Sequence, residues 1–150
     1  MVVITFIEVI KKASQFVKGI FNKIIFVLRT QLYDMYYYPL GFDEFARILK
    51  KWKEEKLPKL IYVSERFDCD DFAACFQAFI VEESRKNACG RAFGSLCIEK
   101  TCGGHAWNFV LVETKKGVEF ICIEPQLGEL VPCTGESFDK FRYNLQWIIG

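Results

Sequence analysis

The sequence contains no run of apolar residues long enough to cross a membrane. Its most hydrophobic region, GIFNKIIFVL, is interrupted by Lys23 and bounded by Lys18 and Arg29. It falls well short of the roughly 20 apolar residues that a membrane helix needs. The first residues, MVVITFIEVIKK, place Glu8 inside an apolar run and the lysines after it, the reverse of the order in a secretory signal. These absences predict an intracellular, cytoplasmic protein.

An excess of charge of either sign is also missing. The net charge of the 150 residues is +1, so no overall field favours an acidic partner, and we predict no nucleic-acid partner. Apolar residues make up 51% and charged residues 26% of the chain, which is typical of a globular protein. Because no linker-like segment divides the sequence, we expect a single domain over residues 1–150.

Histidine is scarce and cysteine is abundant. His105 is the only histidine, whereas the chain has seven cysteines. An odd number of thiols leaves at least one cysteine outside any intramolecular disulfide. In an ordinary cytosol all of them would stay reduced. The sequence alone assigns no pairing.

The first third of the chain predicts helices. Residues 2–32 carry apolar side chains at roughly helical spacing, with basic residues between them. Such an amphipathic segment can lie on a membrane or a partner, but more often it packs on its own domain. Membrane contact through residues 1–32 is therefore the less expected interpretation. A second amphipathic helix, FDEFARILKKWKEE at residues 42–55, should end before Pro58.

The stretch CDDFAACFQAFIVEESRK has the strongest helical pattern and begins with Cys69. Asp70 and Asp71 would lie in its first turn, where the helix dipole favours anions. Asp68 or Cys69 would be the N-cap. Capping accounts for the aspartates but not for the thiol, and a helix start is a favourable place for a thiolate.

The rear of the chain predicts strands. Residues 87–104 are rich in glycine and cysteine and predict a loop with a short strand around residues 95–99. HAWNFVLVE at 105–113 and VEFICIEP at 118–125 predict a hairpin around the turn TKKG. FRYNLQWIIG predicts a last strand. We therefore expect an α+β fold with a helical N-terminal part packed on a small antiparallel sheet.

The predicted hairpin brings His105 close to a carboxylate. If Glu113 pairs with Val118, Gln126 lies opposite His105 and Glu124 lies one diagonal step away on the same face. A three-residue turn would instead place Glu124 on the other face.

These residues form a candidate catalytic set. Cys69 would be the nucleophile and His105 the general base and acid, because histidine moves protons near neutral pH. Glu124 is a plausible residue to orient His105, and Gln126 and Asn108 are its rivals.

The blocks FDCDDFA, GGHAWNFVLV and EFICIEPQ resemble the papain-like cysteine peptidase domain found at the C-terminus of a mushroom agglutinin and in related phage proteins. A weaker likeness is to bacterial transglutaminase-like cysteine proteinases. The resemblance covers roughly residues 33–150. It implies a papain-like or transglutaminase-like fold and a cysteine peptidase or amide hydrolase that acts on a peptide or protein substrate. Cys69, His105 and Glu124 would be its catalytic residues. The sequence requires no cofactor, but the calcium dependence of the agglutinin domain implies a metal role for Asp70 and Asp71.

Two alternatives give His105 no catalytic role. CIEKTCGGH places Cys97, Cys102 and His105 at C-x4-C-x2-H spacing, and Cys89 or Cys133 could complete a zinc site. The protein would then be a zinc-stabilised structural or binding module. It could also be a catalytically inactive interaction protein on the same fold.

Overall fold

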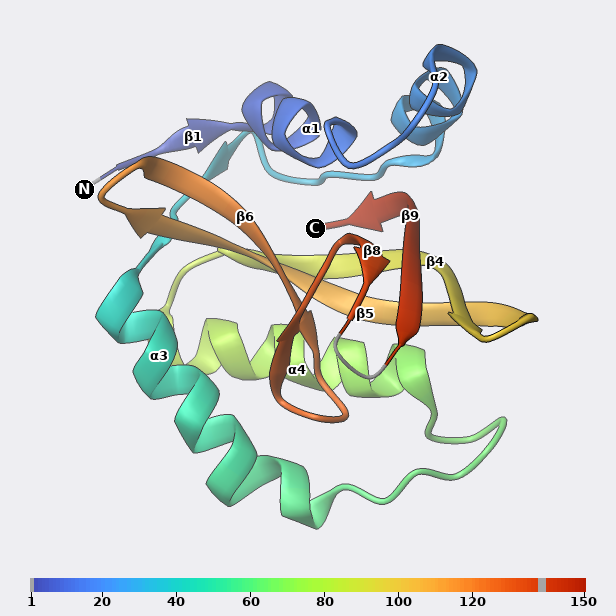
Figure 1. Cartoon of the computed structure of the whole chain (residues 1–150). Coiled ribbons are helices and arrows are strands. Elements are labelled where there is room, and N and C mark those ends of the chain that lie inside the picture. The colour runs from blue at the N-terminus through green and yellow to red at the C-terminus, as the bar shows by residue number, and fades with distance from the viewer. Residues whose placement is uncertain (1, 138–139) are drawn as a thin grey trace.

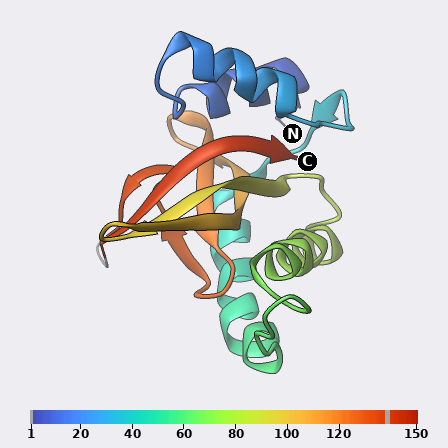
Figure 2. The same cartoon turned by 90° about the vertical axis from the view of Figure 1, so that its right-hand side faces the viewer.

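The computed structural model describes residues 2–137 and 140–150, and these form three layers (Figure 1). The middle layer is a sheet. Helices α1 (Phe6–Ser14) and α2 (Ile20–Arg29) lie over one face, and helices α3 (Phe42–Lys51) and α4 (Cys69–Ser84) lie over the other (Figure 2). Among the described residues, none of the helices is both long enough and apolar enough to span a membrane.

The main sheet has seven strands: β3 (Leu40–Gly41), β4 (Cys89–Ile98), β5 (Thr101–Thr114), β6 (Gly117–Glu124), β7 (Glu129–Val131), β8 (Thr134–Glu136) and β9 (Phe141–Ile149). Their order is β7-β6-β5-β4-β9-β8, with neighbours antiparallel. Strand β3 pairs in parallel with the end of β5. Strands β1 (Ile4–Thr5) and β2 (Tyr36–Tyr37) form a separate two-stranded sheet.

The main sheet is strongly curled. Strands β7 and β8 lie at opposite ends of the strand order, yet only Pro132 and Cys133 separate them in the chain. Three residue steps reach at most about 11 Å, whereas the outer strands of a flat six-strand path would lie about 24 Å apart. The sheet must therefore bend back on itself, as Figure 1 shows.

The predicted small sheet is wrong, and the predicted N-terminal helical segment is two helices rather than one. The sheet is large because the segment predicted as a loop with a short strand around residues 95–99 contains the longer strand β4, which pairs with β5 along its whole length and also with β9. The front is split into α1 and α2 at Gly19, whose φ of 83° suits glycine. The hairpin and the last strand are confirmed, as β5, β6 and β9.

Residues 106–112 of strand β5 are buried on both faces, with a core on each. Phe109 and Leu111 belong to the core under α1 and α2, whereas Val110 and Val112 belong to the core with α3 and α4. Side chains alternate along a strand. His105 therefore shares the face of Phe109 and Leu111.

Candidate functional site

Packing fixes the start of helix α4. Asp68 is its N-cap, and the Asp68 backbone N–H donates to Asp71 Oδ2 at 3.2 Å. Phe76 and Ile80 are fully buried in the core between α4 and the sheet. Cys69 lies at this fixed end as a half-buried, free thiol. The predicted helix and its cap are confirmed.

The hairpin brings a carboxylate to the histidine. Glu113 pairs with Val118, as the sequence predicts. His105 Nε2 donates to Glu124 Oε2 at 2.7 Å, and the two side chains are only 9% and 4% exposed. Cys69 and His105 line the same groove, and an interaction with Cys69 contributes to the raised pKa of His105. The structure thus places Cys69 beside a histidine that is hydrogen-bonded to Glu124.

The environment of His105 favours its charged form. Burial lowers the pKa of His105, but the hydrogen bonds to Cys69 and Glu124, together with their negative charge, outweigh burial and raise the pKa from 6.5 to about 9. His105 is therefore protonated at neutral pH. The folded state holds this proton more tightly than the unfolded chain does. The resulting stability is complete below pH 6.5 and is lost as the pH rises through about 9.

Two further groups hold Glu124 in place. Tyr143 Oη donates to Glu124 Oε2 at 3.3 Å, and the Gln126 backbone N–H donates to Glu124 Oε1 at 3.3 Å. Gln126, a predicted rival of Glu124, thus supports Glu124 through its main chain. Sequence reasoning missed Tyr143, because in the sequence it looks like any other buried residue of a strand.

Asn108, the other predicted rival, lies on the opposite face of β5. Its Nδ2 donates to the Ala73 carbonyl in α4 at 2.9 Å and to the Gly90 carbonyl in β4 at 3.1 Å. The side chain is fully buried. Asn108 therefore ties the helix that carries Cys69 to the sheet that carries His105.

The thiol opens into a shallow groove of about 310 Å³. Its lining residues come from α4, β4, β5 and β9: Cys69, Asp70, Phe93, Gly94, Gly104, His105, Ala106, Gln146 and Trp147. The rings of Phe93 and Trp147 stack with their centroids 4.0 Å apart. A Cβ at Gly94 would clash with the Asn144 carbonyl, so glycine is needed where β4 and β9 shift register. Sequence reasoning missed this aromatic wall and the glycine beside it.

An acidic cluster surrounds Cys69. The ligand atoms of Asp68, Cys69 and Asp70 lie within 4.8 Å of one another. A hydrogen bond between the two carboxyl groups lowers the pKa of Asp68 and raises the pKa of Asp70. Asp71, predicted as a calcium ligand, accepts the N-cap hydrogen bond. Two carboxylates are fewer than the roughly six to eight oxygen ligands that calcium takes, so the cluster fits calcium only in part.

The predicted zinc site is wrong. Cys97 forms a disulfide with Cys102, and Cys122 forms a disulfide with Cys133. A zinc ligand must be a free thiolate, and these four sulfurs are oxidised. Of the cysteines that were candidate ligands, only Cys89 remains free.

Comparison with known proteins identifies a family and a fold. Residues 3–140 match the family model described as the ricin-type beta-trefoil lectin C-terminal domain. A solved structure described as a "PSL1a-E64 complex" is 22% identical with a TM-score of 0.63, over 99% of this chain and 51% of that one. The Polyporus squamosus lectin bound to the human-type influenza-binding epitope Neu5Aca2-6Galb1-4GlcNAc is 25% identical with a TM-score of 0.53, over 81% of this chain and 42% of that one. Among curated proteins, none matches. The chain spans about half the length of these two structures.

These findings correct the sequence-based family. The papain-like or transglutaminase-like family and fold class predicted from the sequence are wrong, because the chain matches a family of lectin domains. This finding also overturns the predicted hydrolase or cysteine protease activity. It overturns the predicted peptide or protein substrate as well, because the Polyporus lectin was solved with a glycan. The three sequence blocks misled because they cover only the surroundings of Cys69, His105 and Glu124. The chain belongs to the family of ricin-type beta-trefoil lectin C-terminal domains.

Proposed function

We propose that this chain is an interaction domain of a glycan-binding lectin and that the groove beside Cys69 is its binding site. Membership of a lectin domain family is the observation that carries the proposal. The Polyporus squamosus lectin, which shares the fold, was solved with a sialylated glycan. Because the chain spans about half of that lectin, we assign sugar binding to the half that the chain covers.

The groove has the chemistry that a sugar ring needs. The apolar face of a sugar can pack on the half-buried ring of Trp147, which is stacked on Phe93. The exposed side chains of Asp70 and Gln146 line the same groove and offer hydrogen-bonding groups for hydroxyls. An aromatic wall with a few polar groups is typical of a small-ligand site.

Sugar binding can be followed through Trp147. Trp52 and Trp107 are fully buried, so a change in tryptophan emission on adding Neu5Aca2-6Galb1-4GlcNAc would report on Trp147. We expect saturable binding that weakens by about tenfold or more in Trp147→Ala, because removing a central aromatic side chain typically costs more than about 1.4 kcal/mol. Because Trp147→Ala lacks the tryptophan that gives the emission signal, its affinity is measured by calorimetry.

The exposed Tyr62 lies on a loop outside the groove, so Tyr62→Ala is the matched control and should bind like the unaltered chain. The absence of saturable binding to this glycan and to a glycan array would overturn the proposal.

One specific observation favours a second function, covalent chemistry at Cys69. His105 lines the same groove as Cys69 and is anchored by Glu124, so it can exchange a proton with a group that the thiol attacks. In this proposal Cys69 is the nucleophile, His105 the proton carrier and Glu124 the orienting carboxylate. It assigns no peptide substrate.

Calcium binding stays a prediction. Asp68 and Asp70 supply two carboxylates beside Cys69, and further oxygen ligands would have to come from backbone carbonyls or water. A calcium ion there would be held by Asp70, while Asp71 would keep its hydrogen bond at the N-cap of α4.

A cytoplasmic location also stays a prediction. The two disulfides favour an oxidising compartment instead.

A further inference from the structure

Helix α2 exposes an apolar stripe on the outer side of the molecule. The stripe consists of Ile20, Phe21, Ile24, Val27 and Leu28, all exposed, with Ile20 at 82% and Leu28 at 79%. At 100° per residue these five side chains fall within about 120° of the helix surface. Contiguous exposed apolar patches of this kind mark interaction sites.

The stripe is not the face that holds α2 on the domain. Phe26, which points away from the stripe, is fully buried in the core between the N-terminal helices and the sheet. Figure 1 and Figure 2 show α2 in the layer on the opposite side of the sheet from α3 and α4. The helix therefore has one apolar side packed on its own domain and another that faces outward.

The charges around the stripe have one sign. Lys23 borders the stripe, and Lys18 and Arg29 lie farther round the helix, toward β9; all three are exposed. Residues 9–33 contain five basic residues and no acidic residue. A second copy of the chain would bring like charges together across the stripe. An anionic surface would meet complementary charges instead.

We propose that helix α2 binds an anionic phospholipid surface, with the stripe at the boundary between headgroups and acyl chains and Lys18, Lys23 and Arg29 on the phosphates. A lipid surface offers both properties together: an apolar layer for aliphatic and aromatic side chains, and a phosphate layer for the cations beside them. The helix has ten residues and would lie in the plane of the interface. The stripe shares no lining residue with the groove beside Cys69, although Leu28 and Arg29 line a neighbouring pocket with Trp147.

The test is co-sedimentation of the chain with vesicles of phosphatidylcholine alone or with one quarter phosphatidylserine. We expect binding only to the phosphatidylserine vesicles, with at least about a tenfold loss in Phe21→Ser/Leu28→Ser and in Lys23→Glu/Arg29→Glu. Raising the salt concentration should also weaken binding. All four side chains are exposed, so these changes should leave the fold intact, which circular dichroism checks.

Ile61→Ser and Lys56→Glu are the matched controls, because they change an exposed apolar and an exposed basic side chain outside α2. Both should bind like the unaltered chain. Equal binding to both kinds of vesicle, or binding to neither, would overturn the proposal. A dimer detected by light scattering that Phe21→Ser/Leu28→Ser converts to a monomer would also overturn it, because the stripe would then be an interface between two copies.

Discussion

Replacing His105 by alanine should slow the reaction of Cys69 with iodoacetamide at pH 7 by about tenfold or more, because a neighbouring imidazolium stabilises negative charge that develops on the sulfur. His105 carries its proton up to pH about 9 and lines the same groove as Cys69. Replacing it by alanine removes this positive charge. Mass spectrometry of the native protein after brief labelling gives the rate at each cysteine.

The chain contains its own reference thiols for this measurement. Cys89 is fully buried, and burial raises the pKa of its thiol, so it should remain unlabelled. Cys75 is half-buried further along the same helix and has no histidine partner among the described residues. Its rate should not change in His105→Ala. If Cys69 and Cys75 react equally fast in the unaltered chain, Cys69 is not an activated thiol.

Glu124→Gln tests the carboxylate separately, because glutamine keeps the shape and removes the charge. Glu124 orients His105 and supports its proton, so this variant should also slow labelling of Cys69, but less than His105→Ala does. Glu119→Gln, an exposed change in the same strand, is the control and should have no effect. A Glu124→Gln variant that labels at the full rate would exclude Glu124 as the orienting residue.

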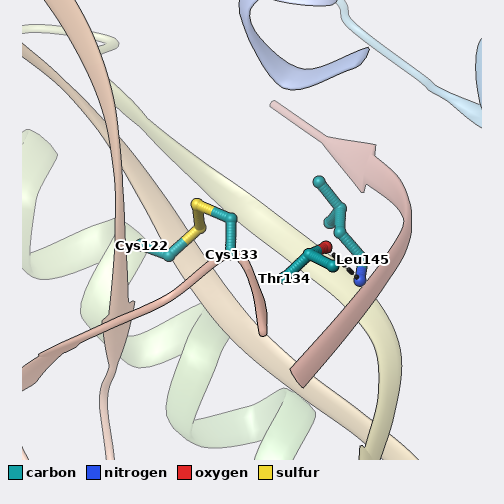
Figure 3. Close-up of a disulfide and its surroundings, with 4 residues drawn as sticks. All are labelled: Cys122, Cys133, Thr134 and Leu145. Carbon is teal, nitrogen blue, oxygen red and sulfur yellow. Dashed lines mark hydrogen bonds between the residues drawn. A yellow bond between two sulfur atoms is a disulfide. The ribbon is translucent and has the colours of Figure 1, made fainter. Parts of the chain in front are cut away.

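Removing the Cys122–Cys133 disulfide should lower the free energy of unfolding by about 3 kcal/mol. The bond spans 11 residues, and its two cysteines are buried in the core under α1 and α2. It anchors the short link from β7 to β8, on which the curl of the sheet depends. Figure 3 shows the bond next to Thr134, whose Oγ1 accepts a hydrogen bond from the Leu145 backbone N–H at 3.3 Å.

The second disulfide is a matched control for this prediction. Cys97 and Cys102 are five residues apart and already face each other as partners in the β4–β5 hairpin. Because the hairpin itself holds them together, Cys97→Ala/Cys102→Ala should cost clearly less than Cys122→Ala/Cys133→Ala. Urea unfolding of the two double variants compares them. Equal costs would show that the β7–β8 link does not depend on its disulfide.

The parts of the molecule that could be predicted are those with local signals. Helix α4 has an amphipathic pattern and an acidic first turn, and the β5–β6 hairpin has a polar turn that fixes its register. Register and alternation together placed Glu124 beside His105. These two elements carry the three candidate residues Cys69, His105 and Glu124.

The parts that could not be predicted depend on contacts between distant segments. Strand β4 is rich in glycine and cysteine, which have little strand preference, and it forms because β5 and β9 pair with it on both sides. Gly94 and Tyr143 are needed only because β9 returns against β4 and Glu124. The family was missed for a related reason, since a local arrangement of side chains does not determine a fold or its function.

The most direct test of the account is a nuclear magnetic resonance titration of the imidazole, which is free of overlap because His105 is the only histidine. Cys69 and Glu124 together hold a proton on His105. The expected results are therefore a pKa of about 9 for His105 in the unaltered chain and a lower pKa in both Glu124→Gln and Cys69→Ala. A pKa near 6.5 that neither substitution changes would contradict this role of Cys69 and Glu124.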